Sequence, residues 1–393
     1  MEPGIQGAGN ECAATTQEAG LIRAAVVRNL PGTPQLEEVS VAAPRKSEIL
    51  VRTAAAGICA SDVQVLDGRM AGQVPAVLGH EAAGVVEDVG EDVARLRRGD
   101  RVLICQSSHC GACEQCLKGH PSLCRSPGLR TRADGTPRVT ARGETVHLGS
   151  GIGAFSELML VHERAAVPLP EAVPARTATM LGCAVTTGIG AVLRTAGVPA
   201  GATVAVVGAG AIGLSCVQGA RLTGAARIVA VDQQAQRLRT ALDFGATDTV
   251  LAGGDDVVEA VKELTDGGVE YAFEAVGRAV TVEQSFRMLR MGGVCTVIGI
   301  VPKSTPITLK ASALLAERRL QGSANGSNRF HLDVPRYLAL YEQGRLKLDE
   351  MIGAAVPLAE IGRGIEATRE RRHTRTVVSF DGCAVGGPAG DAA

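Results

Sequence analysis

Aromatic side chains are scarce in this chain, which has no tryptophan, three tyrosines and an aromatic content of 2%. Proteins that bind single-stranded nucleic acid stack bases on aromatic side chains, so this scarcity argues against that class of partner. An excess of one charge is also lacking, since 40 lysines and arginines balance 41 aspartates and glutamates. Without a concentrated basic surface, we expect neither a nucleic-acid nor a membrane partner.

Long uninterrupted apolar runs are missing as well. The most hydropathic window, residues 204–217, is broken by Gly208, Gly210 and Gly213, so we expect no membrane-spanning helix. The first twenty residues contain acidic side chains and lack the apolar core of a signal peptide. We therefore expect residues 1–20 to form a flexible tail and the protein to be cytoplasmic.

The 393 residues are enough for two domains. Up to residue 186, short β-like runs alternate with glycine, proline and aspartate, a pattern typical of an irregular β-rich domain. From about residue 196, apolar strands alternate with helical stretches, among them a helix expected over residues 281–291. This alternation predicts a doubly wound parallel sheet of the α/β class. We expect one domain from residues 1–186 and 326–393, with the second domain, 187–325, inserted between its two pieces.

Four cysteines lie within fifteen residues at a spacing that favours a metal site over disulfides. They are Cys110, Cys113, Cys116 and Cys124, in a C-x2-C-x2-C-x7-C run. Four thiolates so close in sequence can surround a zinc ion without a distant partner, and such a closed site is structural, not catalytic. An iron–sulfur cluster uses the same ligands, and chance clustering of free thiols is the third possibility.

A glycine-rich loop, G-x-G-x-x-G, follows the strand-like residues 202–207 and begins a helical stretch. Gly208 permits the tight turn, Gly210 lets a pyrophosphate approach the backbone, and Gly213 allows close packing of helix on strand. Asp232 stands nineteen residues later, at the end of the second strand, where it would bind ribose hydroxyls and repel a 2′-phosphate. This pattern predicts NAD in preference to NADP; a structural turn with an ordinary surface aspartate is the alternative.

A third, scattered set contains Cys59, His80 and Cys183. Two thiolates and one imidazole would leave one coordination position open, as catalytic zinc requires. Taken singly, each cysteine is more often a buried apolar side chain, and His80 a hydrogen-bonded structural histidine. Spacing alone does not bring the three together.

These segments, in their order along the chain, resemble the zinc-dependent, medium-chain alcohol dehydrogenases. The resemblance runs from about residue 22 to 380 and rests on GICASDVQVLDG, LGHEAAGVVEDVG, the four-cysteine run, LGCAVTTGIG, GAGAIG and TRTVVSF. The segment RADGTPRVTARGETVHLGSGIGAFSE resembles the long-loop, dimeric branch that includes liver-type and thiol-linked formaldehyde dehydrogenases. The resemblance implies a GroES-like catalytic domain, a Rossmann coenzyme domain, two zinc ions per chain and a homodimer.

The resemblance also implies roles for single residues around the metal. Cys59, His80 and Cys183 match the catalytic zinc ligands. Glu81 matches an acid that can approach the metal, and Asp62 matches the carboxylate that orients the ligand histidine. A zinc ion held there would act as a Lewis acid on an alcohol.

Further positions match residues that contact substrate and coenzyme in the family. Ser61 matches the hydroxyl that hydrogen-bonds the alcohol oxygen and starts proton removal, and Thr187 and Ile212 match residues beside the nicotinamide ring. Arg237 matches a basic residue near the adenosine ribose, and Arg375 one that contacts the pyrophosphate. For both arginines a solvated surface charge is the alternative.

The chain departs from the family at four positions. Ala60 replaces a basic residue of the pyrophosphate site, and Gln64 replaces a histidine that passes the proton to solvent. Gln106 and Gly149 replace bulky walls of the liver-type pocket, which predicts a wider, more polar pocket and a bulky or polar primary alcohol or aldehyde as substrate. A thiol adduct of formaldehyde, an enzyme with permanently bound NAD, and non-redox chemistry on the same fold are the alternatives. Five cysteines are expected to be ordinary reduced thiols: Cys12, Cys105, Cys216, Cys295 and Cys383.

Overall fold

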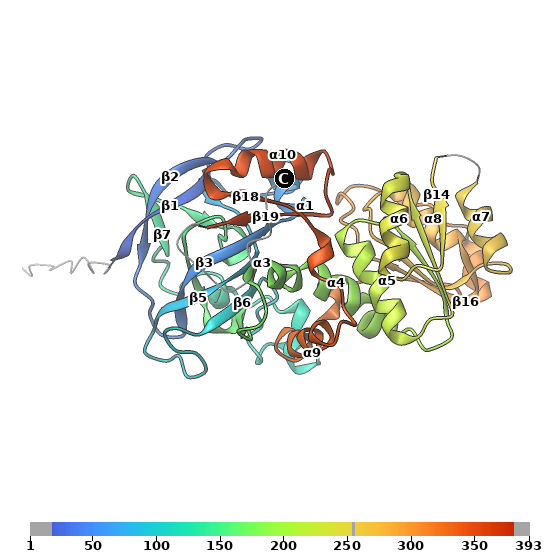
Figure 1. Ribbon diagram of the computed structural model, residues 1–393, viewed down its shortest axis with the longest axis horizontal. Coiled ribbons are helices and arrows are strands. Elements are labelled where there is room, and N and C mark those ends of the chain that lie inside the picture. The colour runs from blue at the N-terminus through green and yellow to red at the C-terminus, as the bar shows by residue number, and fades with distance from the viewer. Residues whose placement is uncertain (1–17, 254–255, 381–393) are drawn as a thin grey trace, which may run out of the picture.

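A computed structural model describes residues 18–253 and 256–380. Figure 1 shows a β-rich half joined to a half in which helices flank a parallel sheet, with helices α3 (Ala175–Ala178), α4 (Ala184–Gly190) and α9 (Phe330–Glu342) near the junction. The C-terminal elements β18 (Ile352–Pro357), α10 (Ile361–Arg369) and β19 (Arg375–Ser379) return to the β-rich half. The expected fold class is therefore confirmed.

Two sheets form the β-rich half of the described chain. One has the strand order β8 (Glu144–Thr145), β7 (Val139–Ala141), β2 (Gln35–Ala42), β1 (Glu18–Val27), β4 (Ala76–Val77) and β9 (His147–Leu148). The other has the order β11 (Ala166–Pro168), β6 (Arg101–Cys105), β5 (Glu81–Val89), β3 (Glu48–Ile58), β19 and β18, and β10 (Leu158–His162) also pairs with β3. Helices α1 (Ala60–Leu66) and α2 (Glu114–Leu117) lie in loops of this half.

The third sheet is parallel and has the order β14 (Asp248–Leu251), β13 (Arg227–Asp232), β12 (Thr203–Val207), β15 (Val269–Glu274), β16 (Leu289–Val297) and β17 (Arg319–Gly322). Its connecting helices are α5 (Ala211–Thr223), α6 (Ala235–Phe244), α7 (Val257–Leu264) and α8 (Ala279–Arg287). The central strands are buried and rich in valine because helices cover both faces of such a sheet.

The largest hydrophobic cluster crosses the junction between the two halves. It joins Ala83 and Leu103 of the β-rich half to Val204 and Phe273 of the parallel sheet. Separate clusters fill the interior of the β-rich half and one side of the parallel sheet. Shared packing of this kind stabilises one arrangement of the halves around the space between them.

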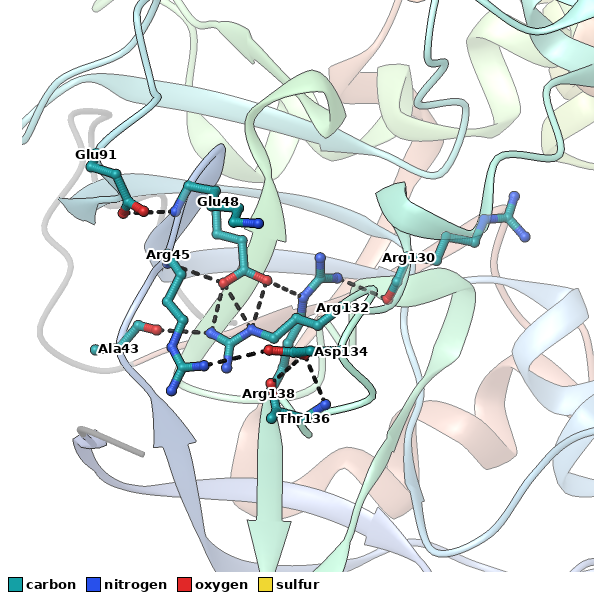
Figure 2. Close-up of polar contacts among 10 residues, drawn as sticks. Ala43, Arg45, Glu48, Glu91, Arg130, Arg132, Asp134, Thr136 and Arg138 are labelled. Atoms are coloured by element: carbon teal, nitrogen blue, oxygen red, sulfur yellow. Dashed lines mark hydrogen bonds and ion pairs between the residues drawn. The ribbon is translucent and has the colours of Figure 1, made fainter. Parts of the chain in front are cut away.

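Glu48, the first residue of β3, is the centre of a buried ion cluster (Figure 2). Its carboxylate accepts hydrogen bonds from Arg132 Nη2 at 2.6 Å and from Arg138 Nε at 2.8 Å. Arg138 also donates to the carbonyl oxygen of Arg130 at 2.8 Å. Burial alone would raise the pKa of Glu48, but the two guanidinium groups outweigh it and lower the pKa. The cluster fastens the loop of residues 125–138 to the sheet.

The structure corrects two local expectations. Residues 18–20 of the expected tail belong to strand β1, whereas residues 1–17, with Cys12, and residues 381–393, with Cys383, lie outside the described chain. The helix expected over residues 281–291 ends at Arg287, because Leu289 already pairs with Val269 in the parallel sheet.

No membrane-spanning helix was expected among the helices of the described residues. None of them is individually long and apolar enough to cross a membrane. Residues 175–182 and 184–196 reach the required length and composition only as a pair, joined across a bend of 46°.

Candidate active site

The three scattered residues, with Glu81, form a compact cluster of possible metal ligands. One ligand atom from each of Cys59, His80, Glu81 and Cys183 lies within 4.8 Å of all the others. Strand register explains part of this convergence: β3 pairs Gly57 with Glu81, which brings the end of β3 beside the start of β5. The four residues are at most 9% exposed. Two sulfurs and an imidazole nitrogen in a buried cluster are a donor set suited to zinc.

Asp62 connects the first turn of α1 to the histidine. Its Oδ2 accepts the backbone N–H of Cys59 at 2.9 Å, and its Oδ1 lies 3.1 Å from His80 Nδ1. With the proton on Nδ1, the Nε2 lone pair of His80 is left buried without a hydrogen-bond partner. Carboxylates orient metal-binding histidines in this way. The structure therefore places Asp62 against the His80 ring, and its role beside a bound metal stays a prediction.

The electrostatics of the cluster reflect close contact between buried ionisable groups. The neighbouring Cys183 thiol lowers the pKa of Cys59 well below its usual value, and Cys59 raises the pKa of Cys183. Burial works to lower the pKa of His80, but the Asp62 carboxylate outweighs it and the pKa rises. A divalent cation in this cluster would favour the thiolate form of both cysteines.

Glu81 is buried beside the cluster, and both of its carboxylate oxygens lack a hydrogen bond. Burial raises the pKa of Glu81 to about 8, although Arg375 opposes the shift from 3.2 Å away. Arg375 Nη1 also donates to the carbonyl oxygen of Ile58 at 3.0 Å, whereas its Nε is buried without a hydrogen-bond partner. The structure thus places Arg375 against Glu81, and its contact with a pyrophosphate stays a prediction.

The four sequence-adjacent cysteines also meet. The Sγ atoms of Cys113 and Cys116 lie 3.5 Å apart, and the Sγ atom of Cys110 lies 3.9 Å from that of Cys116. Four sulfurs at about 2.3 Å from a central zinc ion lie about 3.8 Å from one another. An iron–sulfur cluster places several iron and sulfide ions inside its thiolates and needs a wider separation. The spacing therefore fits a single tetrahedral ion.

The glycine loop lies between β12 and α5. Gly208 has a φ of +97°, and a Cβ on Gly213 would lie 1.7 Å from the Gly208 carbonyl oxygen. A Cβ on Gly210 would instead face open space, with the nearest atom 4.0 Å away on Arg237. The fold itself therefore requires glycine at positions 208 and 213. Gly210 instead leaves open space at the N-terminus of α5, where a phosphate group could bind.

Asp232 ends β13 beside this loop. Its carboxylate accepts the backbone N–H groups of Ala209 at 2.8 Å and Gln234 at 3.0 Å. Arg237 lies 3.9 Å from the same carboxylate and donates to the Arg371 carbonyl oxygen at 3.3 Å. Partial burial lowers the pKa of the Arg237 guanidinium. Asp232 and Arg237 are thus neighbours at the carboxyl end of β13, where the ribose of a dinucleotide would bind.

A cavity of about 770 Å³ is lined by Cys59, His80 and Cys183 and by residues of both halves. Ser61, Thr187 and Ile212 line it, as do the departures Ala60, Gln64, Gln106 and Gly149. Among the described residues that line this cavity there is no lysine or arginine. Apart from the ligand cluster, Asp62 and His147, the cavity is therefore lined by uncharged polar and apolar side chains.

Sequence reasoning missed several polar residues of this cavity, and two of them lie in β9 or beside Gln106. His147 in β9 and Ser150 both line it, and Ser150 Oγ donates to Gln106 Oε1 at 3.0 Å. Ser150 has a φ of +56°, an uncommon conformation for a residue other than glycine. Its position in the glycine-rich run LGSGIG was the signal available, because a serine between glycines can occupy a tight turn.

Comparisons with known proteins support the same conclusion. Residues 45–171 match the alcohol dehydrogenase GroES-like domain, and residues 211–343 match the zinc-binding dehydrogenase family. The protein named probable S-(hydroxymethyl)glutathione dehydrogenase 1, from Schizosaccharomyces pombe, is 35% identical over 366 residues, which cover 91% of this chain and 97% of that protein.

Solved structures match over the same length. An alcohol dehydrogenase zinc-binding domain protein from Burkholderia ambifaria is 34% identical, with a TM-score of 0.88. The benzyl alcohol dehydrogenase of Acinetobacter calcoaceticus is 29% identical, with a TM-score of 0.87. Each comparison covers 92% of this chain and 99% of the other. Together with the clustered ligands, these matches show that the chain belongs to the zinc-dependent alcohol dehydrogenases, oxidoreductases that use zinc and a nicotinamide dinucleotide.

Proposed function

We propose that this enzyme transfers hydride between NAD and a bulky or polar primary alcohol, or the corresponding aldehyde. The observation that carries the proposal is the cavity of about 770 Å³. It contains Cys59, His80 and Cys183 together with Thr187 and Ile212, the positions expected beside the nicotinamide. One space thus offers room for both reactants of a hydride transfer.

We assign the catalytic metal to Cys59, His80 and Cys183. Zinc bound there supplies a Lewis acid that lowers the pKa of an alcohol. Asp62 holds the His80 ring in the orientation that presents Nε2 to the metal. Glu81, buried without hydrogen bonds, is available as an exchangeable oxygen ligand. We assign the structural zinc to the four cysteines of residues 110–124.

Proton removal is assigned to Ser61, whose hydroxyl lines the cavity with the ligands. Gln64 lines the cavity as well, but an amide does not titrate near neutral pH. His147 also lines the cavity, outside the ligand cluster, and its imidazole is the chemically suitable next acceptor. Closure of the surrounding walls would exclude water from the reacting groups.

Coenzyme binding is assigned to the loop of Gly208, Gly210 and Gly213, at the N-terminus of α5. The open space at Gly210 supports close approach of a pyrophosphate. The carboxylate of Asp232, at the end of β13, favours ribose hydroxyls over a 2′-phosphate, so NAD is the proposed coenzyme. Arg237 is assigned to the adenosine ribose and Arg375 to the pyrophosphate, the roles that the family resemblance implies for these positions.

The lining of the cavity favours a neutral substrate. Gln106 and Gly149 stand where bulky walls were expected in liver-type relatives, and both line the space. The similarity to a benzyl alcohol dehydrogenase favours an aromatic primary alcohol. The relative named for S-(hydroxymethyl)glutathione favours a thiol adduct as the second candidate. Because the described lining lacks lysine and arginine, the carboxylates of such an adduct would find no ammonium or guanidinium partner there.

Steady-state kinetics test the proposal. Zinc-loaded enzyme is assayed with NAD or NADP against ethanol, benzyl alcohol and S-(hydroxymethyl)glutathione, with Cys59→Ser as the inactive control. We expect the highest kcat/KM with NAD and benzyl alcohol. A higher value for ethanol contradicts the wide-cavity argument, and a higher value for the thiol adduct selects the second candidate. Activity that survives in Cys59→Ser contradicts the assigned zinc site.

We propose a homodimer formed through the β17 edge of the parallel sheet. In the described chain, β17 pairs with β16 on one side only. Leu314 and Leu315, in the segment just before β17, are 53% and 88% exposed. Such apolar exposure beside an unpaired edge suits burial against a second copy. Analytical ultracentrifugation of Leu315→Glu tests this interface, and an unchanged sedimentation coefficient contradicts it.

The described halves also support the proposed division into residues 1–186 with 326–393 and 187–325, although the first boundary falls inside α4. We propose a cytoplasmic location, because all nine described cysteines are free and the cytosol keeps thiols reduced. Fractionation of the producing cells tests the location, and recovery of the protein outside the cytoplasm contradicts it.

A further inference from the structure

Gln106 contacts the proposed metal site from the wall of the cavity. It follows strand β6, which pairs with β5 so that Cys105 lies opposite Glu81. This register brings Gln106 to the ligand cluster, where its Nε2 donates a hydrogen bond to Cys183 Sγ over 3.7 Å. The side chain is only partly buried and also lines the open space. Gln106 thus touches both a proposed ligand and the cavity.

A second contact sets the direction of the amide. Ser150 Oγ donates to Gln106 Oε1 at 3.0 Å, so the amide oxygen is occupied and the NH2 group faces the sulfur. The reverse orientation would place Oε1 against a thiolate, which only accepts hydrogen bonds. Hydroxyl, amide and thiolate therefore form a chain with one consistent donor direction.

The backbone around Ser150 supports that chain. Ser150 has a φ of +56° in the turn Gly149–Gly151, and Gly151 itself has a φ of +74°. A Cβ on Gly151 would lie 2.7 Å from Arg130 Cβ, so this turn rests directly on the loop of residues 125–138. The Glu48 cluster of Figure 2 fastens that loop, since Arg138 binds both the Arg130 carbonyl oxygen and Glu48.

The two cysteine sites differ in the source of their hydrogen bonds. In the four-cysteine lobe the backbone supplies them: Cys110 Sγ accepts from Ala112 N at 3.4 Å and from Cys113 N at 3.2 Å. At Cys183 the donor is the side chain of Gln106. A side-chain donor can be exchanged by mutation without altering the backbone, which makes its effect on the thiolate measurable.

A hydrogen bond to a thiolate ligand has a definite chemical effect. Two thiolates donate enough charge to neutralise a divalent cation, which weakens it as a Lewis acid. An N–H group withdraws electron density from sulfur and restrains its position, as other groups around metal ligands do. The effect strengthens at a buried site, where water does not screen it.

We propose that Gln106, oriented by Ser150, is a positioning residue that restrains the thiolate ligand Cys183 and reduces its electron donation to the metal. This inference rests on the proposed function, in which Cys183 is a catalytic zinc ligand. The competing role for Gln106 is direct contact with the substrate. That role would change KM and leave the metal–sulfur bond unaltered.

The test uses full-length enzyme carrying cobalt(II) at the catalytic site and zinc in the four-cysteine lobe. The thiolate-to-cobalt charge-transfer band reports electron donation from sulfur. We expect the band to move to longer wavelength in Gln106→Leu and in Ser150→Ala, because a thiolate without its hydrogen bond gives up electron density more readily. Gln64→Leu, the same substitution elsewhere in the cavity, is the matched control and should leave the band in place.

A second readout is the loss of zinc from the catalytic site to a chelator. We expect this loss to be about 10-fold faster in Gln106→Leu and Ser150→Ala, within the usual range of about 10- to 100-fold for groups that support metal ligands. An unchanged band in both variants overturns the proposal. Ser150→Ala removes only a hydroxyl, so it keeps the test decisive if Gln106→Leu does not fold.

Failure of the proposed function would look different. If Cys183→Ser leaves the charge-transfer band of the wild-type enzyme intact, Cys183 is not a ligand and the site assignment itself is wrong. If the band depends on Cys183 but not on Gln106 or Ser150, the metal site stands and only this inference fails. A changed KM with an unchanged band assigns Gln106 to the substrate instead.

Discussion

Gly210 offers a way to separate coenzyme binding from folding. A Cβ at this position would meet no atom closer than 4.0 Å, and the backbone φ is −81°, which any residue adopts. Gly210→Ala should therefore keep the fold. The added methyl group would occupy the space proposed for the pyrophosphate and prevent its close approach to the N-terminus of α5.

The magnitudes of the two effects differ. Gly210 is the N-cap of α5, where alanine is disfavoured by about 1 kcal/mol, so stability should fall by no more than that. Loss of one hydrogen bond to a charged phosphate costs about 1.5–3 kcal/mol. At about 1.4 kcal/mol per tenfold, Kd for NADH should rise about 10- to 100-fold.

Gly213→Ala is the matched contrast. Its Cβ would lie 1.7 Å from the Gly208 carbonyl oxygen, a backbone atom that no side-chain rotation can move. Overpacking of this kind costs about 3 kcal/mol or more, so this variant should lose stability before its coenzyme affinity can be judged. The same added methyl group is thus expected to weaken coenzyme binding at position 210 and to destabilise the fold at position 213.

The assays are urea unfolding and titration of NADH fluorescence, which the absence of tryptophan simplifies. The reasoning is refuted if Gly210→Ala binds NADH as tightly as the wild-type enzyme. It is refuted equally if Gly210→Ala unfolds at the same urea concentration as Gly213→Ala, because the glycine would then serve packing. Binding of NADH to Gly213→Ala at wild-type stability would contradict the assigned role of that glycine.

Three further predictions concern other sites. Asp232→Ser should raise the kcat/KM for NADP relative to that for NAD by about tenfold, because about 1.4 kcal/mol of repulsion of the 2′-phosphate is relieved. An unchanged ratio contradicts the role of Asp232 in NAD preference. Cys113→Ser should lower zinc content from two ions per chain to one, measured by elemental analysis, and unchanged content contradicts a metal in the lobe. Glu48→Gln should cost about 3–5 kcal/mol at neutral pH, because two buried guanidinium groups lose their countercharge. Since arginines lower the folded pKa of Glu48, this stabilisation is complete above the ordinary value of about 4.3 and is lost as pH falls through the lowered pKa. Unfolding midpoints of Glu48→Gln and wild type should therefore converge in acid, and a constant difference contradicts the prediction.

The sequence by itself determined the features whose partners are close along the chain. The four cysteines of residues 110–124 lie on one short loop, so their spacing alone predicts that they meet. The glycine loop is equally local, because Gly208 and Gly213 act on each other across one turn. Alternating strands and helices predicted the parallel sheet, since buried strands must be apolar on both faces.

Only the tertiary structure decided which distant residues meet. The β3–β5 register brings Cys59, just after β3, close to His80 and Glu81 at the start of β5, and Cys183 joins them from the N-terminus of α4. A shift of one residue in that register would turn Glu81 to the other face of the sheet. The β5–β6 register likewise brings Gln106 to Cys183. Composition carries no signal for such contacts, since an isolated glutamine or buried cysteine has many ordinary positions in a protein.

The ion cluster around Glu48 and the contact between Arg375 and Glu81 could not be predicted from the sequence for the same reason. Glu48 and Arg138 are ninety residues apart, and their charges are common in any sequence. Arg375 matched a coenzyme contact, yet the folded chain pairs it with Glu81. A charge finds its partner through the packing that excludes water around it, and that packing exists only once the sheets have assembled.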